Sequence, residues 1–179
     1  MTFTKNDKIE MLENALSWIV VMAMLIYGIG KIIQFEGAAE IDKTIPEMTG
    51  MELMWAFYGY SKPFVLTLGF LEVMGGILIF IKKTRIIGCL FTSTILINVI
   101  MQDIFFGVHL GALKAALLYQ IFIIAILWLN RDRLIKSFNI LIKREKNIEL
   151  NRTFIVKSII AFALFLVIRI LEYVLTIKM

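Results

Sequence analysis

Residues 63–81 read PFVLTLGFLEVMGGILIFI, and this stretch decides the class of fold. It is apolar throughout except for a single charged residue, Glu72. A helix rises about 1.5 Å per residue, so this stretch is long enough for the hydrocarbon core of a bilayer, which is about 30 Å thick. The stretch therefore predicts a transmembrane helix with one carboxyl group near its middle.

Further apolar stretches of similar length flank this one: residues 15–35, 86–106, 110–129 and 154–177. The last is the least regular, because it contains Lys157, Arg169 and Glu172. We expect the first three to form a four-helix bundle with residues 63–81, and the last to be a fifth transmembrane helix.

The composition agrees with a membrane protein. Of 179 residues, 60% are hydrophobic and 18% are charged, and the mean hydropathy is +0.85. Soluble domains are about 45–50% apolar and about 25% charged, and disordered chains are less hydrophobic still. The composition thus argues against both classes. It predicts an all-α integral membrane four-helix bundle with a fifth transmembrane helix and interfacial helices.

The counts of metal-ligating residues argue against several chemistries. Cys89 is the single cysteine and His109 the single histidine, so an internal disulfide and a bis-histidine haem site are both excluded. A zinc site needs more ligands of these types. The chain also lacks a glycine-rich phosphate-binding motif. Neither haem nor metal is indicated.

Lysine and arginine residues predict the orientation. They concentrate in residues 5–8, 82–85 and 131–152, and such residues favour the cytoplasmic side of a membrane. We therefore expect a cytoplasmic N-terminus, and a periplasmic C-terminus if the fifth helix crosses. Because these charges flank apolar stretches, we expect contact with the lipid bilayer and no binding of nucleic acid.

Three segments follow from this pattern: a membrane bundle (1–130), a basic amphipathic cytoplasmic segment (131–153) and the fifth helix (154–179). In the acidic loop 36–62, Thr49 and Glu52 have the spacing of a capping box and predict a short surface helix. This helix is either an interfacial anchor or a lid over a pocket. The basic segment meets anionic lipid heads or docks a partner.

A set of polar residues recurs at one depth in the four predicted bundle helices: Tyr27, Glu72, Asn98 and Gln120. Ionisable groups inside a membrane helix are costly and usually functional. We expect these four side chains to converge on a ligand-binding site. The alternative is structural, with Glu72 protonated and hydrogen-bonded to Asn98 or Tyr27.

Two further pairs of charges are close in depth or in sequence. Lys31 and Asp103 both lie near the outer helix ends and have opposite charge, which predicts an ion pair, although Lys31 is also within reach of Glu72. Arg169 and Glu172 are three residues apart and predict a polar contact surface for another subunit.

Several of these motifs together resemble the DoxX-like membrane proteins, over roughly residues 15–138. They are GFLEVMGG at 69–76, KKTR at 82–85 followed by Gly88, and YGIGK at 27–31. The resemblance implies a four-helix bundle in a bacterial cytoplasmic (inner) membrane. It also implies an association with quinone-linked sulfur oxidation or with redox partners. The fifth helix lies outside it.

The leading hypothesis is a binding or accessory membrane subunit that holds a small apolar ligand, a quinone or a lipid, or supports a membrane partner or a second copy of the chain. Two alternatives stay open. One is a quinone-linked oxidoreductase subunit or a lipid-modifying enzyme that uses Glu72 as acid or base. The other is a purely structural subunit of a larger complex. The sequence leaves open whether the protein is an enzyme.

Overall fold

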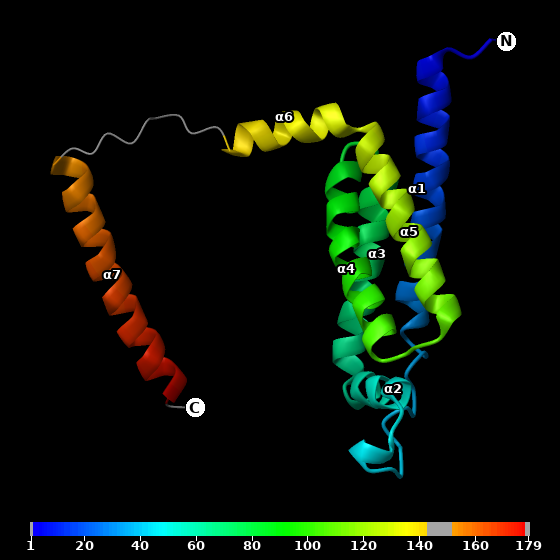
Figure 1. Cartoon of the computed structure of the whole chain (residues 1–179), viewed down its shortest axis with the longest axis horizontal. Helices are drawn as coiled ribbons and strands as arrows, with labels where there is room; N and C mark the ends of the chain where they lie inside the picture. Colours follow the sequence, from blue (N-terminus) through cyan, green and yellow to red (C-terminus); the bar gives the residue numbers. More distant parts are fainter. Residues whose placement is uncertain (1, 143–151, 178–179) are drawn as a thin grey trace. The chain divides into compact units, whose positions relative to one another are not determined.

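A computed structural model describes residues 2–142 and 152–177, and every regular element in these ranges is a helix (Figure 1). The predicted all-α class is confirmed. The longer helices are α1 (Lys5–Gly30), α2 (Gly50–Tyr60), α3 (Lys62–Phe80), α4 (Arg85–Phe105), α5 (Leu110–Leu129), α6 (Arg131–Ile142) and α7 (Arg152–Ile177). One turn of 3-10 helix, Ile45–Glu47, precedes α2.

Five of the described helices are long and apolar enough to cross a membrane: α1, α3, α4, α5 and α7. Four of them follow the predicted stretches to within about two residues, a normal uncertainty for helix ends. The first differs, because α1 begins ten residues before the predicted start at 15 and ends before 35.

The early start of α1 has a clear cause. Thr4 and Asp7 form a capping box, in which the Thr4 hydroxyl accepts the Asp7 N–H at 3.2 Å and the Asp7 carboxylate accepts the Thr4 N–H at 2.9 Å. After Gly30 the backbone hydrogen bonds change to the 3-10 pattern, in which each N–H donates to the oxygen three residues earlier, as from Ile32 to Ile29. The prediction of 15–35 was therefore wrong at both ends.

Helices α1, α3, α4 and α5 run side by side, and their contacts close a ring in the order α1, α3, α4, α5 (Figure 1). In this ring α1 and α4 lie at opposite corners. Helix α2 contacts α3 and lies at the end of the bundle where α1 ends. The ring decides which side chains can meet across the bundle.

Helices α1 and α3 touch through their backbones at two glycines. A Cβ atom added at Gly69 would lie 2.4 Å from the Gly28 oxygen, and one added at Gly28 would lie 2.6 Å from the Gly69 oxygen. Small residues allow this approach, as is common between membrane helices. The two helices run in opposite directions, so the contact places the Cβ of Lys31 beside Gly69 and the Cβ of Glu72 beside Gly28, and the two long side chains meet across it.

A packed core fills the half of the bundle near the α3–α4 turn. Its fully buried members are Val20, Ile79, Cys89, Ile123 and Ile126. Cys89 is therefore a small packing residue, as its sequence position predicts.

The predicted surface helix and amphipathic segment are both present as helices. Helix α2 begins at the predicted Thr49–Glu52 capping box. Helix α5 ends before Asn130, whose side-chain amide donates to the Ile126 oxygen at 3.0 Å. Helix α6 starts directly after Asn130. Residues 143–151, part of the predicted basic segment, lie outside the described residues.

The chain divides into two compact units, Met1–Phe138 and Asn139–Met179. The division falls inside the predicted segment 131–153, and the segment boundaries at 130 and 153 stay predictions. Helix α7, in the second unit, has no buried residue among residues 152–176, the part whose side chains are described.

We expect Gly69→Ala to lower the thermal unfolding midpoint in detergent. Its methyl group would overlap the Gly28 oxygen, and such overpacking costs about 1–3 kcal/mol. Gly30→Ala is the matched control, because an added Cβ there meets nothing within 4 Å. Equal midpoints for the two variants would contradict the close approach of α1 and α3.

Candidate functional site

A cavity of about 630 Å³, here called the main cavity, lies at the α2 end of the bundle. Its walls come from all four helices of the ring, and residues of α2 and the turn after α1 complete them. Three of the four predicted ligand-binding residues line it: Tyr27, Glu72 and Asn98. Lys31, Asp103 and His109 line it as well. The structure thus brings most of the predicted polar residues together.

Gln120 is not among the residues that line the main cavity. Its amide nitrogen donates to the Ser93 hydroxyl at 2.6 Å, across the α4–α5 contact. Depth alone does not fix the face of a helix, since each residue turns by about 100°. The prediction that Gln120 joins the other three residues was therefore wrong.

Lys31 pairs with Glu72, with its Nζ 3.2 Å from Oε1 of Glu72. The expected Lys31–Asp103 ion pair is therefore absent from the described contacts. Lys31 pairs instead with Glu72, the other partner that the sequence allowed. The ring explains this choice, because α1 packs on α3 through Gly28 and Gly69 but lies diagonal to α4. Lys31 also lies over the Phe35 ring, 5.9 Å from its centroid.

Two carboxyl oxygens of the main cavity have no hydrogen-bond partner: Oε2 of Glu72 and Oδ2 of Asp103. Both residues are buried, with 5% and 6% of their surface exposed. Buried polar atoms in proteins are nearly always hydrogen-bonded, so two unpartnered carboxyl oxygens in the walls of one cavity are unusual. Protein atoms cover both oxygens almost completely, so a ligand in the cavity would reach them only after the side chains turn.

Asn98 has a different partner from the one the structural alternative predicts. Its side-chain oxygen accepts from the Gln102 amide at 2.5 Å, and the Gln102 oxygen accepts from the Tyr58 hydroxyl at 2.6 Å. Burial raises the pKa of Tyr58 above its ordinary value, which keeps the hydroxyl protonated as a donor. This chain of bonds ties α2 to α4.

Aromatic rings join α2 to the turn after α1. Phe35 stacks on Tyr58 with centroids 4.9 Å apart and meets Trp55 edge-on at 5.2 Å. Tyr58 also stacks on Phe64 at the start of α3. All four rings line the main cavity.

A short polar network fixes the start of α2. The Thr49 N–H donates to Oε2 of Glu52 at 2.8 Å, and Lys43 bonds the other oxygen at 2.5 Å. Lys43 and the Thr49 donors lower the pKa of Glu52 to about 2. His109 has a similar role at α5, where its Nδ1 accepts the Gly111 N–H at 3.0 Å.

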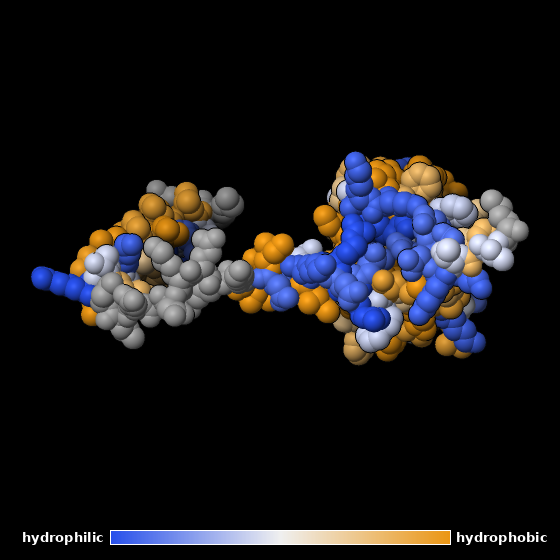
Figure 2. All heavy atoms as spheres, turned by 90° about the horizontal axis from the view of Figure 1, so that it is seen from above, coloured by the Kyte–Doolittle hydropathy of each residue, from blue (hydrophilic) through white to orange (hydrophobic). Residues whose placement is uncertain are grey.

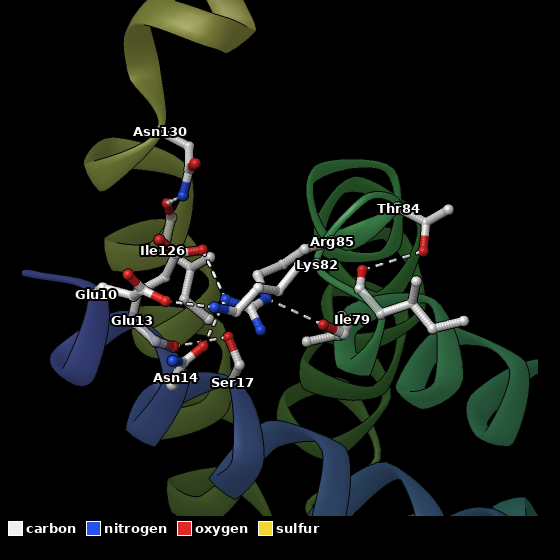
Figure 3. Close-up of polar contacts among 11 residues, drawn as sticks. Glu10, Glu13, Asn14, Ser17, Ile79, Lys82, Thr84, Arg85, Ile126 and Asn130 are labelled. Carbon is white, nitrogen blue, oxygen red and sulfur yellow. Dashed lines mark hydrogen bonds and ion pairs between the residues drawn. The ribbon is translucent and has the colours of Figure 1, made fainter.

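At the opposite end of the bundle, Arg85 forms a buried cluster that the sequence did not predict (Figure 3). Its guanidinium donates to Glu13 at 2.8 Å, to Asn14 at 3.1 Å and to the Ile79 oxygen at 3.1 Å. Lys82 pairs with Glu10 nearby, where both side chains are exposed. The cluster thus ties the first turns of α1 to the α3–α4 connection.

Around this cluster is a smaller cavity of about 320 Å³, lined by charged residues. Figure 2 shows hydrophilic atoms gathered over this end of the bundle, with hydrophobic atoms around its rim. Each polar atom of the Arg85 cluster named above has a protein partner. We therefore regard the main cavity as the candidate ligand site and this cluster as a structural one.

The remaining predicted residues lie on α7. Arg169 and Glu172 form an ion pair with each other, and both side chains are more than half exposed. Their predicted role as a partner contact stays a prediction. Among residues 2–142 and 152–177, no group of three or more histidine, cysteine, aspartate or glutamate residues is placed to hold a metal ion.

Comparison with known proteins finds a distant relative of this chain. The chain is 28% identical over 116 residues to a protein of Bacillus subtilis (strain 168) named "Uncharacterized protein YwoB". The match covers 63% of this chain and 73% of that protein. No protein-family model and no solved structure matches the chain. The resemblance to DoxX-like proteins therefore stays a prediction.

We expect Arg85→Ala to destabilise the bundle by about 3–5 kcal/mol, because it leaves Glu13 without its cation in a mostly buried place. Lys82→Ala is the matched control and should cost less than about 1 kcal/mol, since its ion pair with Glu10 is exposed. Chemical unfolding in mixed micelles compares the two. Similar losses would show that Arg85 has no special role.

We expect acid to weaken the start of α2 in a defined range. The pKa of Glu52 is lowered in the folded chain, so its carboxylate stabilises α2 above about pH 4.5, and this contribution is lost as pH falls toward about 2. Hydrogen exchange of the first α2 amides measures the loss. Lys43→Ala should move it to higher pH, whereas Lys62→Ala, which removes an ion pair with Glu36, should not.

Proposed function

We propose that this chain is a multi-pass membrane protein whose bundle binds a small apolar ligand, a quinone or a lipid, in the main cavity. It acts as a binding or accessory subunit with little chemistry of its own. The observation that carries the proposal is the cavity itself, with aromatic and aliphatic walls and a few buried polar groups. This combination is typical of sites for small apolar molecules.

The proposal of a membrane location is supported by the outer surface of the bundle. Large apolar side chains are exposed along the helices, as at Trp18, Ile26, Phe70 and Ile121, while hydrophilic atoms gather at one end (Figure 2). Such a surface suits lipid chains. The placement of basic residues favours a cytoplasmic N-terminus, which puts the main cavity at the outer face. A bacterial cytoplasmic membrane is the location that the DoxX-like motifs imply, and the Bacillus subtilis relative favours a bacterial protein.

An enzyme that uses Glu72 as acid or base is a second candidate. One observation favours it, since Asp103 and His109 line the same cavity as Glu72 and could exchange protons with a bound molecule. Against it, no ion pair or hydrogen bond among the described residues joins Glu72 to either of them. A binding role needs no such contact.

A partner role rests on α7. An ion pair such as Arg169–Glu172 within a long apolar helix is costly in lipid, so it favours contact with another subunit. This role is compatible with ligand binding by the bundle.

Native mass spectrometry of the protein, released gently from its own membrane, tests these proposals together. We expect a bound small molecule in the wild type and about tenfold lower occupancy in Glu72→Gln, because the buried Lys31–Glu72 pair is lost. Glu36→Gln is the control, since Glu36 is exposed at the same end of the bundle.

Ala116→Phe guards against a folding defect in Glu72→Gln. Ala116 lines the main cavity, so a phenyl ring there should fill it and displace the ligand. Leu117→Phe, on the exposed side of α5, should not. A wild type without any bound molecule would contradict the binding proposal. A second polypeptide that disappears in Arg169→Leu/Glu172→Leu would support the partner role.

A further inference from the structure

The charges of the main cavity define the head group of its ligand. We propose that the cavity binds an amphiphile with a protonated amine head, held by the free carboxyl oxygens of Glu72 and Asp103. This inference rests on the proposed function, because it presupposes that the main cavity binds an apolar molecule. It narrows the ligand from any quinone or lipid to a cationic one.

The charges of the residues that line the main cavity do not balance. Glu72 and Asp103 both line the cavity and both are buried, but Lys31 is the one described lysine or arginine among the lining residues. Lys31 is bonded to Glu72 and lies against Phe35, so it compensates one carboxylate. A buried carboxylate without a partner is costly. One positive charge on the ligand would complete the balance.

The two carboxyl groups also have unused hydrogen-bonding capacity. The unpartnered atoms Oε2 of Glu72 and Oδ2 of Asp103 are acceptors when their carboxyl groups are ionised. An ammonium group has three donors and no acceptor, so its chemistry suits carboxylate acceptors of this kind. The carbonyl oxygens of an oxidised quinone only accept hydrogen bonds, and a fatty-acid carboxylate would add a third negative charge. Both are poorer matches.

Aromatic and aliphatic side chains surround the two carboxyl groups. The rings of Phe35, Tyr58 and Trp55 line the cavity and give it a large apolar surface. Leu68, Leu96 and Val99 line it too and suit an alkyl chain. A cavity of about 630 Å³ is within the usual range of about 300–1,000 Å³ for small-molecule sites.

The test compares three probes that share one alkyl chain and differ in the head: dodecylamine, 1-dodecanol and dodecanoate. The full chain is placed in phosphatidylcholine nanodiscs with Trp18→Phe and Trp128→Phe, which leaves Trp55 in the cavity as the single tryptophan. Its fluorescence reports binding. Because all three probes partition into lipid, their Kd values are compared as mole fractions in the lipid.

We expect dodecylamine to bind about tenfold more tightly than 1-dodecanol, a typical gain for a charge-assisted hydrogen bond, and dodecanoate to bind most weakly. Asp103→Asn should lower the affinity for the amine to that for the alcohol, and an unchanged circular dichroism spectrum shows that the variant is folded. Asp103→Glu should keep the preference. Glu36→Gln, which removes an exposed carboxylate at the same end, should have no effect.

The outcomes separate this inference from the proposed function. Equal binding of the amine and the alcohol, both saturable, would overturn the amine head and leave the proposed cavity intact. Equal losses in Asp103→Asn and Glu36→Gln would also overturn it, since the amine would then respond to surface charge only. Absence of saturable amine binding would overturn it whatever native mass spectrometry finds, and that measurement decides the proposed function independently.

Discussion

The backbone contact between Gly28 and Gly69 is the constraint on which the site depends. It sets α1 against the antiparallel α3, with Lys31 beside Gly69 and Glu72 beside Gly28, so that the two long side chains meet across the contact. It also leaves α4 diagonal to α1, where Asp103 has no lysine to pair with. Glu72 therefore has a lysine partner and Asp103 has none, because the glycines at positions 28 and 69 decide which helices are neighbours.

The two ends of the bundle satisfy their buried charges differently. Arg85 donates from Nε and Nη1 to three partners, and buried apolar residues pack beside it. In the main cavity, oxygens of Glu72 and Asp103 remain without partners near a group of aromatic rings. Satisfied charges are thus concentrated at one end of the helices and unpartnered carboxyl oxygens at the other, a division that proteins with functional sites often show.

The sequence predicted the helices well because their signals are local. Apolar length defined four of the five long helices, and the Thr49–Glu52 spacing located α2. The Thr4–Asp7 spacing is the same kind of signal and could have located the start of α1. The partner of Lys31, the position of Gln120 and the burial of Arg85 could not be predicted, because each depends on which helices are neighbours. The sequence shows how far along a helix a residue lies. It does not show which side of the helix faces the bundle interior, or which helix packs against that side.

The packed core beneath the main cavity has a mechanical consequence. Val20, Ile79 and Ile123 are fully buried there, whereas the α2 end of the bundle holds a cavity of about 630 Å³. Pressure favours states with less void volume, so it acts more strongly on the cavity end of the bundle than on the packed end.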